Sequence, residues 1–228
     1  MTSEYPFIAR QGWPLILVCV VAALVLYYMA GAVWSLPAWL LAVVVAYLYR
    51  DPERDVPPSP LGLVSPADGY VTHVVEDHDP HLDREAVRIS IHMDPLGSYT
   101  LRIPTEGKVM KIWFPSQEEG DEGLTRVSAS SGGAIERYAI WVQTDEGDDA
   151  VIVIRLYRWS IRPQCYIHIG QRIGQGQRCG IIGLGGAIDV FVPSDARIDV
   201  QEGDKVRAGS DIIATFTRQT QERAAGSD

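Results

Sequence analysis

The chain has 228 residues, a formal net charge of −9 at pH 7 and 46% hydrophobic residues. This length suits one ordinary domain with an appendage. The acidic balance disfavours a nucleic-acid partner, and it excludes attachment to anionic lipids through a polybasic surface.

Two uncharged, apolar runs open the chain and predict a membrane-anchoring helical hairpin within residues 1–50. The first run, 14–34, is long enough to cross a hydrocarbon core of about 30 Å, whereas the second, 36–49, is short for a full span. Basic residues precede the first run and follow the second, so the positive-inside rule places the soluble part on the cytoplasmic side of the inner membrane. These residues are Arg10, Arg50 and Arg54.

A cleaved signal peptide is the alternative for this region. Ala30-Gly31-Ala32 has the A-x-A form of a cleavage site. The first run is longer than a usual signal core and a second run follows it directly, so we favour the hairpin.

The composition changes at Asp51. A charged, proline-rich segment over 51–60 cannot continue a helix and predicts a linker. Residues 61–220 alternate short runs rich in Val, Ile and Tyr with turn signals, which predicts an all-β domain of sandwich or barrel type, and 221–228 predict a flexible tail. Strands are predicted at 70–76, 86–92, 108–114, 138–143, 150–157, 165–169, 187–192, 198–201 and 212–216.

A short pattern recurs in this part: an acidic residue, then glycine, then a valine that begins a strand. It occurs as Pro66-Ala-Asp68-Gly69, as Pro104-Thr-Glu106-Gly107 and, more loosely, around Glu202-Gly203. The last copy continues into a segment that resembles the hammerhead segments of lipoyl- and biotinyl-type domains, but the attachment lysine is missing. The resemblance implies a barrel-sandwich architecture and not a carrier.

Three local features have simple interpretations. Asp77-His78-Asp79-Pro80-His81-Leu82-Asp83 suggests a metal, but one short loop rarely completes a coordination sphere, so we expect an exposed turn between strands and no metal. His92 is expected on a strand face. The three cysteines show no disulfide or metal spacing, which indicates a reducing compartment.

Several motifs in a fixed order resemble one family over nearly the whole chain. They are PFIARQGWP, YRDPERDVP, VSPADGYV, HMDPLGSYTLRIPTEGKV, GQGQRCGIIGLGGAIDVFVP and VQEGDKVRAGSDIIA. The chain resembles the short bacterial and archaeal form of phosphatidylserine decarboxylase. This resemblance implies a proenzyme that cleaves a Gly-Ser bond in a segment of the form FGSRVDVYLP and turns the serine into a pyruvoyl group. That carbonyl acts as the electron sink when phosphatidylserine loses CO₂.

The resemblance also assigns site residues. Gly185 and Gly186 stand at the Gly-Ser cleavage site, Tyr99 at the base histidine of a segment of the form MSPLDVHVNR, and Asp68 at the acid that orients this base. Glycine has no hydroxyl to attack and none to eliminate, and a phenol with a pKa of about 10 is a poor base at neutral pH. Gly97-Ser98 lacks the strand context of a cleavage bond. We therefore expect no self-made pyruvoyl group and no other cofactor.

Two functional hypotheses follow. The first is a non-catalytic homologue in phospholipid metabolism, which binds phosphatidylserine or a related lipid as a homo-oligomer or beside an active paralogue. The alternative is an active decarboxylase with an unrecognised electron sink. Arg155, Arg158 and Arg162 are candidates for lipid-headgroup contact, because arginine suits phosphate oxygens, or they are ordinary surface arginines.

Overall fold

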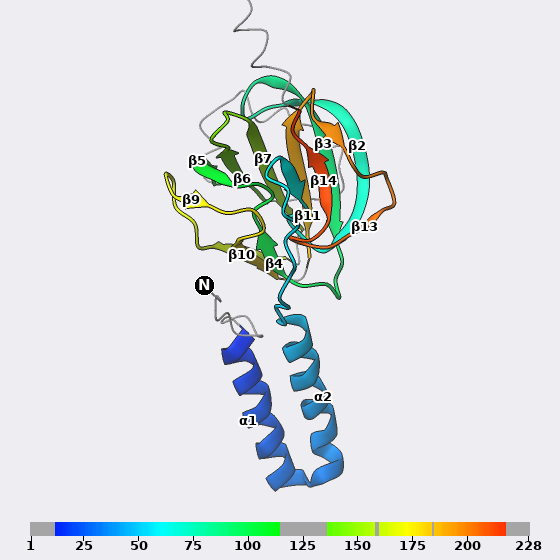
Figure 1. Cartoon of the computed structure of the whole chain (residues 1–228). Coiled ribbons are helices and arrows are strands. Elements are labelled where there is room, and N and C mark those ends of the chain that lie inside the picture. The colour runs from blue at the N-terminus through cyan, green and yellow to red at the C-terminus, as the bar shows by residue number, and fades with distance from the viewer. Residues whose placement is uncertain (1–11, 115–135, 158–159, 184, 218–228) are drawn as a thin grey trace, which may run out of the picture. The chain divides into compact units, whose positions relative to one another are not determined.

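A computed structural model describes residues 12–114, 136–157, 160–183 and 185–217, with the backbone alone at 136–137 and 161–162 (Figure 1). The chain divides into two compact units. A helical unit contains the chain up to Glu53 together with Leu96–Tyr99, and a β unit contains Arg54–Pro95 and the chain from Thr100 onward. Each unit is described by itself.

The helical unit is a hairpin of α1 (Gly12–Ala30) and α2 (Ala32–Leu48). In the part of the chain that the structure describes, α1 is the one helix long and apolar enough to cross a membrane, and α2 is shorter. The small side chains of Ala23 and Ala42 are buried, which allows the helices to approach closely. The two predicted helices are confirmed, but the break between them lies at Gly31, inside the first predicted run, and the role of the hairpin as a membrane anchor stays a prediction. Gly31 has a φ of 88°, which favours glycine.

The β unit is built around one antiparallel eight-stranded sheet that curls into a half-barrel (Figure 1). Its strands, in spatial order, are β13 (Lys205–Val206), β2 (Gly69–Asp79), β3 (Arg84–Met93), β11 (Ala187–Pro193), β7 (Asp149–Leu156), β6 (Glu136–Gln143), β5 (Gly107–Trp113) and β9 (Arg172–Ile173). Two three-stranded sheets accompany it. One has the order β1 (Gly62–Val64), β14 (Ile212–Thr215) and β12 (Arg197–Ile198), and the other β4 (Thr100–Arg102), β10 (Arg178–Gly183) and β8 (Ile161–Cys165).

Both faces of the central strand β11 are buried. Ile188 and Val190 point into the main core, with Ile91 of β3 and Ile154 of β7 among its fully buried members. Phe191 belongs to a second apolar cluster. Each such side chain contributes about 1.5–3 kcal/mol when it leaves water. The strand that follows the Gly185–Gly186 turn is therefore fixed firmly in place.

The mostly β fold is confirmed. Four of the nine predicted strands lie within observed ones, and those at 108–114, 150–157 and 212–216 each extend one residue beyond an observed strand. The prediction of a strand at 165–169 is wrong beyond Cys165, because the chain turns there. The Gln171 amide donates to the His168 carbonyl at 3.1 Å, and Gly170 has a φ of 83°. The strand predicted at 198–201 is confirmed only at Ile198, in β12. The likeness to hammerhead segments stays a prediction, and so do the predicted domain boundaries; residues 221–228 lie outside the described residues.

The acidic-glycine pattern has a steric cause in two of its three copies, whereas Gly203 in the third has open space and a φ of 94°. A Cβ on Gly69 would collide with the carbonyl oxygen of His92, and a Cβ on Gly107 would collide with that of Gln143. Both glycines open a strand, β2 and β5, and both allow the neighbouring backbone to come close.

Candidate active site

The predicted cleavage position lies in the turn between β10 and β11. Gly185 and Gly186 are both buried. Gly185 has a φ of 83°, the left-handed region that residues with a Cβ rarely adopt. Ala187 then begins β11 and pairs with His92 of β3 and Arg155 of β7. The turn thus leads directly into β11, which pairs with a strand on each side.

Hydrogen bonds from two other segments hold the turn. The Met93 amide donates to the Gly186 carbonyl at 3.0 Å. The Ser160 hydroxyl donates to the Gly185 carbonyl at 2.7 Å and accepts from the Tyr157 amide at 3.0 Å. A nucleophile at residue 186 would attack the Gly185 carbonyl, and this carbonyl already accepts a hydrogen bond from Ser160. Ser160 was not predicted, because its role depends on two segments that meet only in the folded chain.

The backbone around Gly186 leaves little room for a side chain. A Cβ built there would lie 2.9 Å from the carbonyl oxygen of Arg155 and 3.9 Å from the Met93 sulfur. A contact below 3.0 Å with backbone requires one of the strands to move. This turn has the shape of a glycine site.

Asp68 lies beside this turn within the β unit. Its Oδ2 accepts from the Arg54 guanidinium at 2.7 Å and its Oδ1 accepts from the Ala208 amide at 2.8 Å. The Asp68 carbonyl accepts from the Asp94 amide, next to the Met93 amide that binds Gly186. The end of β3 thereby joins Asp68 to the glycine turn. The carboxylate is held by a cation and a backbone amide, which fixes its orientation.

Tyr99 belongs to the helical unit and is 5% exposed. Its ring meets that of Tyr49 edge to face, with ring centres 6.1 Å apart. Burial, and secondarily the Tyr49 phenol, raise the pKa of Tyr99 above its usual value. The phenol therefore keeps its proton at neutral pH, the state in which it donates a proton rather than accepts one.

The arginine candidates differ in what the structure describes. The Arg155 Nη2 donates to Asp189 Oδ1 at 2.8 Å, and its Nε lies 2.7 Å from Oδ2, although that N–H is not directed at the oxygen. Ser90 also donates to Asp189 Oδ1, at 2.6 Å. This pair is nearly buried, so Arg155 is engaged inside the protein. Arg158 and the side chain of Arg162 lie outside the described residues.

Two functional-type residues near the turn were not assigned from the sequence. Asp189 is a charged residue in the otherwise apolar strand Ala187–Pro193, a signal that could have marked it. His92 was expected on a strand face, and it lies exposed on one, with its Nδ1 3.2 Å from the Tyr157 hydroxyl. His92 pairs with Ala187 and is thus close along the sheet to the glycine turn.

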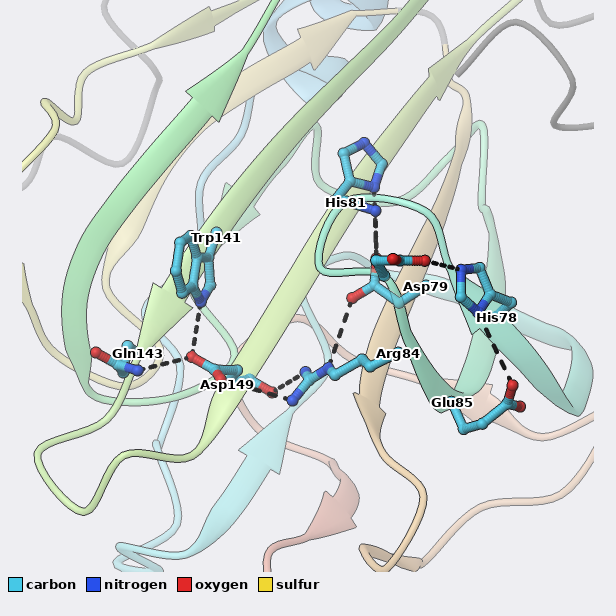
Figure 2. Close-up of polar contacts among 9 residues, drawn as sticks. His78, Asp79, His81, Arg84, Glu85, Trp141, Gln143 and Asp149 are labelled. Atoms are coloured by element: carbon cyan, nitrogen blue, oxygen red, sulfur yellow. Dashed lines mark hydrogen bonds and ion pairs between the residues drawn. The ribbon is translucent and has the colours of Figure 1, made fainter. Parts of the chain in front are cut away.

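A second polar cluster lies at the turn between β2 and β3 (Figure 2). The turn predicted at 77–83 is confirmed only at 80–83, because residues 77–79 still belong to β2. Asp79 is fully buried, and Arg84 lies 3.8 Å from it and 3.6 Å from Asp149. Trp141 donates to Asp149 at 2.7 Å. The turn is less exposed than expected, because Arg84 links the β2–β3 hairpin to Asp149 in the β6–β7 hairpin. Among the described residues, no group of three or more His, Cys, Asp or Glu is arranged to hold a metal ion.

Comparisons with known proteins show which family the chain is similar to. The family model described as phosphatidylserine decarboxylase matches residues 41–214. The chain belongs to the phosphatidylserine decarboxylase family. Relatives named phosphatidylserine decarboxylase proenzyme occur in Nitrosomonas eutropha (37% identical, covering 94% of this chain and 99% of the relative), Aromatoleum aromaticum (36%, 94% and 99%) and Burkholderia mallei (36%, 96% and 100%).

The predicted membership of the phosphatidylserine decarboxylase family is thereby confirmed. It links the chain to phospholipid metabolism, and α1 supports a membrane anchor. Members of this family use a pyruvoyl group derived from their own chain. The roles that the resemblance assigned to Asp68, Tyr99, Gly185 and Gly186 stay predictions.

Proposed function

We propose that this protein acts in phospholipid metabolism as a membrane-anchored, lipid-binding homologue that makes no pyruvoyl group at residue 186. The observation that carries the proposal is Gly186 itself. To form a pyruvoyl group, a serine hydroxyl attacks the preceding carbonyl and then leaves by elimination, and the serine Cβ becomes the methyl group; glycine has neither the hydroxyl nor the Cβ. The group does not fit the present backbone either, because the Arg155 carbonyl oxygen lies 2.9 Å from where a Cβ would be.

The surroundings of a possible base support the same proposal. An activated nucleophile needs a neighbouring group that accepts its proton. Tyr99, at the position that the resemblance assigns to this base, has a raised pKa and therefore donates rather than accepts at neutral pH. Self-cleavage at this turn is therefore disfavoured for two reasons: residue 186 has no nucleophile, and Tyr99 is a poor proton acceptor.

For the bound lipid we propose phosphatidylserine or a closely related serine lipid. Arg158 and Arg162 are the headgroup candidates, because arginine forks match phosphate oxygens. Arg155 stays a weaker candidate, since Asp189 already engages it. An active member of the family, or a second copy of this chain, is the proposed partner.

The comparisons by themselves favour a second candidate, which is decarboxylation of phosphatidylserine to phosphatidylethanolamine and CO₂. The three relatives named above carry that activity in their names and match over nearly their full length. This candidate requires an electron sink from elsewhere, such as a carbonyl-bearing cofactor.

Intact mass of the detergent-solubilised protein tests the main proposal. We expect one mass near 25.2 kDa. Two fragments that meet near Gly185 would overturn the proposal, and the mass of the smaller would identify the residue that reacted.

A turnover assay then separates the two candidates. Uncut protein is incubated with phosphatidylserine in mixed micelles, and phosphatidylethanolamine and CO₂ are measured together. We expect neither product, while serine lipid co-purifies with the protein. Product from uncut protein would instead establish the second candidate.

A further inference from the structure

The segment Leu96–Tyr99 packs with the helical unit, although the sequence places it between β3 and β4. The chain leaves the β unit after Pro95 and returns at Thr100. A loop that joins two strands usually packs against its own sheet. This one is instead part of the unit that contains the apolar helices.

The loop contacts the two residues that follow α2, Tyr49 and Arg50. The Arg50 guanidinium donates to the Leu96 carbonyl, and the Ser98 hydroxyl donates to the Arg50 carbonyl, both at 3.4 Å. The rings of Tyr99 and Tyr49 meet edge to face. The loop therefore packs against the end of the apolar helix α2.

The residues at this helix end have the character of a membrane interface. The Arg50 guanidinium lies 3.7 Å from the centre of the Tyr47 ring. Tyrosine and tryptophan rings favour the level of the lipid headgroups, and arginine at the end of a membrane helix extends its charge toward that level. Within this setting the Leu96 side chain is 63% exposed. A large apolar side chain next to such a belt is suited to lipid.

We propose that Leu96–Tyr99 is a third membrane contact, in which Leu96 inserts at the boundary between headgroups and acyl chains. The occupant is a bilayer surface and not a protein, because the loop packs against the end of an apolar helix. The contact is apolar rather than electrostatic. The segment Leu-Gly-Ser-Tyr contains no basic residue, and Arg50 is already engaged by the loop and by Tyr47.

This contact gives the segment a role that needs no base at Tyr99. The segment that the family resemblance assigns to proton transfer would here hold the protein at the lipid surface. The proposal does not depend on whether the protein binds or decarboxylates serine lipid.

Photo-crosslinking in phosphatidylcholine vesicles tests the proposal. The photoreactive amino acid p-benzoylphenylalanine replaces Leu96 in the full-length protein, which is reconstituted and irradiated. The matched control carries it at Ile169, which is 62% exposed in the β unit, and the positive control at Leu40, which is 66% exposed in α2. Mass spectrometry then detects lipid adducts, and circular dichroism shows that each variant is folded.

We expect lipid adducts at positions 96 and 40 in yields several-fold above that at 169. Adducts at 40 without adducts at 96, or equal yields at 96 and 169, would overturn the proposal. Repeating the experiment with anionic lipid in the vesicles, and again at high salt, should leave the yield at 96 unchanged. A yield at 96 that requires anionic lipid would overturn the apolar contact.

Discussion

Position 186 accepts no side chain without movement of β7, because a Cβ there would lie 2.9 Å from the Arg155 carbonyl oxygen. Gly186→Ala and Gly186→Ser add the same Cβ, and only the second adds a hydroxyl. We expect each to lower the free energy of unfolding by about 1–3 kcal/mol, since overpacking shifts the backbone. Chemical denaturation measures this loss.

The same two variants test the chemistry. We expect both to keep a single intact mass, because Tyr99, at the position that the resemblance assigns to the base, has a raised pKa and keeps its proton at neutral pH. Two fragments from Gly186→Ser alone would show that the hydroxyl suffices, and would contradict this interpretation of Tyr99.

Variants of Ser160 test the hydrogen bond that holds the Gly185 carbonyl. Ser160→Ala removes the donor to the Gly185 carbonyl, and we expect a loss of about 1 kcal/mol in the free energy of unfolding. Ser160→Thr retains a hydroxyl and serves as the matched control. The NMR carbonyl shift of Gly185 should change in the alanine variant and much less in the threonine variant. An unchanged shift in both would mean that this hydrogen bond does not form in solution.

At the scale of elements, a buried ion pair joins β11 to β7. Asp189→Asn leaves the Arg155 guanidinium nearly buried opposite a neutral amide, and we expect a loss of about 3–5 kcal/mol in the free energy of unfolding. The double variant Asp189→Leu with Arg155→Met removes both charges, so we expect it to lose less than Asp189→Asn. Denaturant titration compares the variants. A double variant less stable than the single one would show that packing, not the ion pair, decides.

The turn between β6 and β7 has the opposite electrostatics. Burial first, and then the neighbouring carboxylates of Asp195, Glu146 and Asp149, raise the pKa of Asp148, while Arg84 opposes them. A carboxyl with a raised pKa in the folded state binds its proton more tightly there, so folding becomes more favourable as the pH falls through that pKa.

We therefore expect Asp148→Asn to stabilise the protein at neutral pH, by about 0.5 kcal/mol because surface charges are screened by solvent. The gain over the wild type should vanish in acid, where Asp148 is protonated. Melting temperatures measured across this pH range check the sign, with the exposed Asp55→Asn as control. A gain that persists at low pH would indicate a cause other than charge.

The sequence predicts strands well where β-branched residues recur, as in β3, β7 and β11. It predicts poorly where a strand is too short to show a period, as in β4 and β9, or is interrupted by glycine, as in β10. Site contacts are harder still. The Ser160 hydroxyl and the Gly185 carbonyl are 25 residues apart, and Ser90 and Asp189 are 99 apart. Neighbours along the chain do not determine such pairs, because the order of strands in the sheet does.

For the whole molecule, anchoring depends on apolar contact, because the net charge is −9. We expect high salt to leave the protein in the membrane pellet and detergent to release it. A truncated chain that begins at Arg54 should partition into the soluble fraction far more than the full chain. Release of the full chain by salt alone would contradict an apolar anchor.

Because β11 lies between β3 and β7, cleavage before it would change unfolding from a one-chain process to a two-chain process. A break between Gly185 and Gly186 would make β11 part of a separate polypeptide, held in the middle of the sheet only by its neighbours. Such a pair must separate to unfold and collide to refold, so its melting temperature would rise with protein concentration. In the unbroken chain the peptide bond keeps β11 attached, and a monomer melts at the same temperature at any dilution.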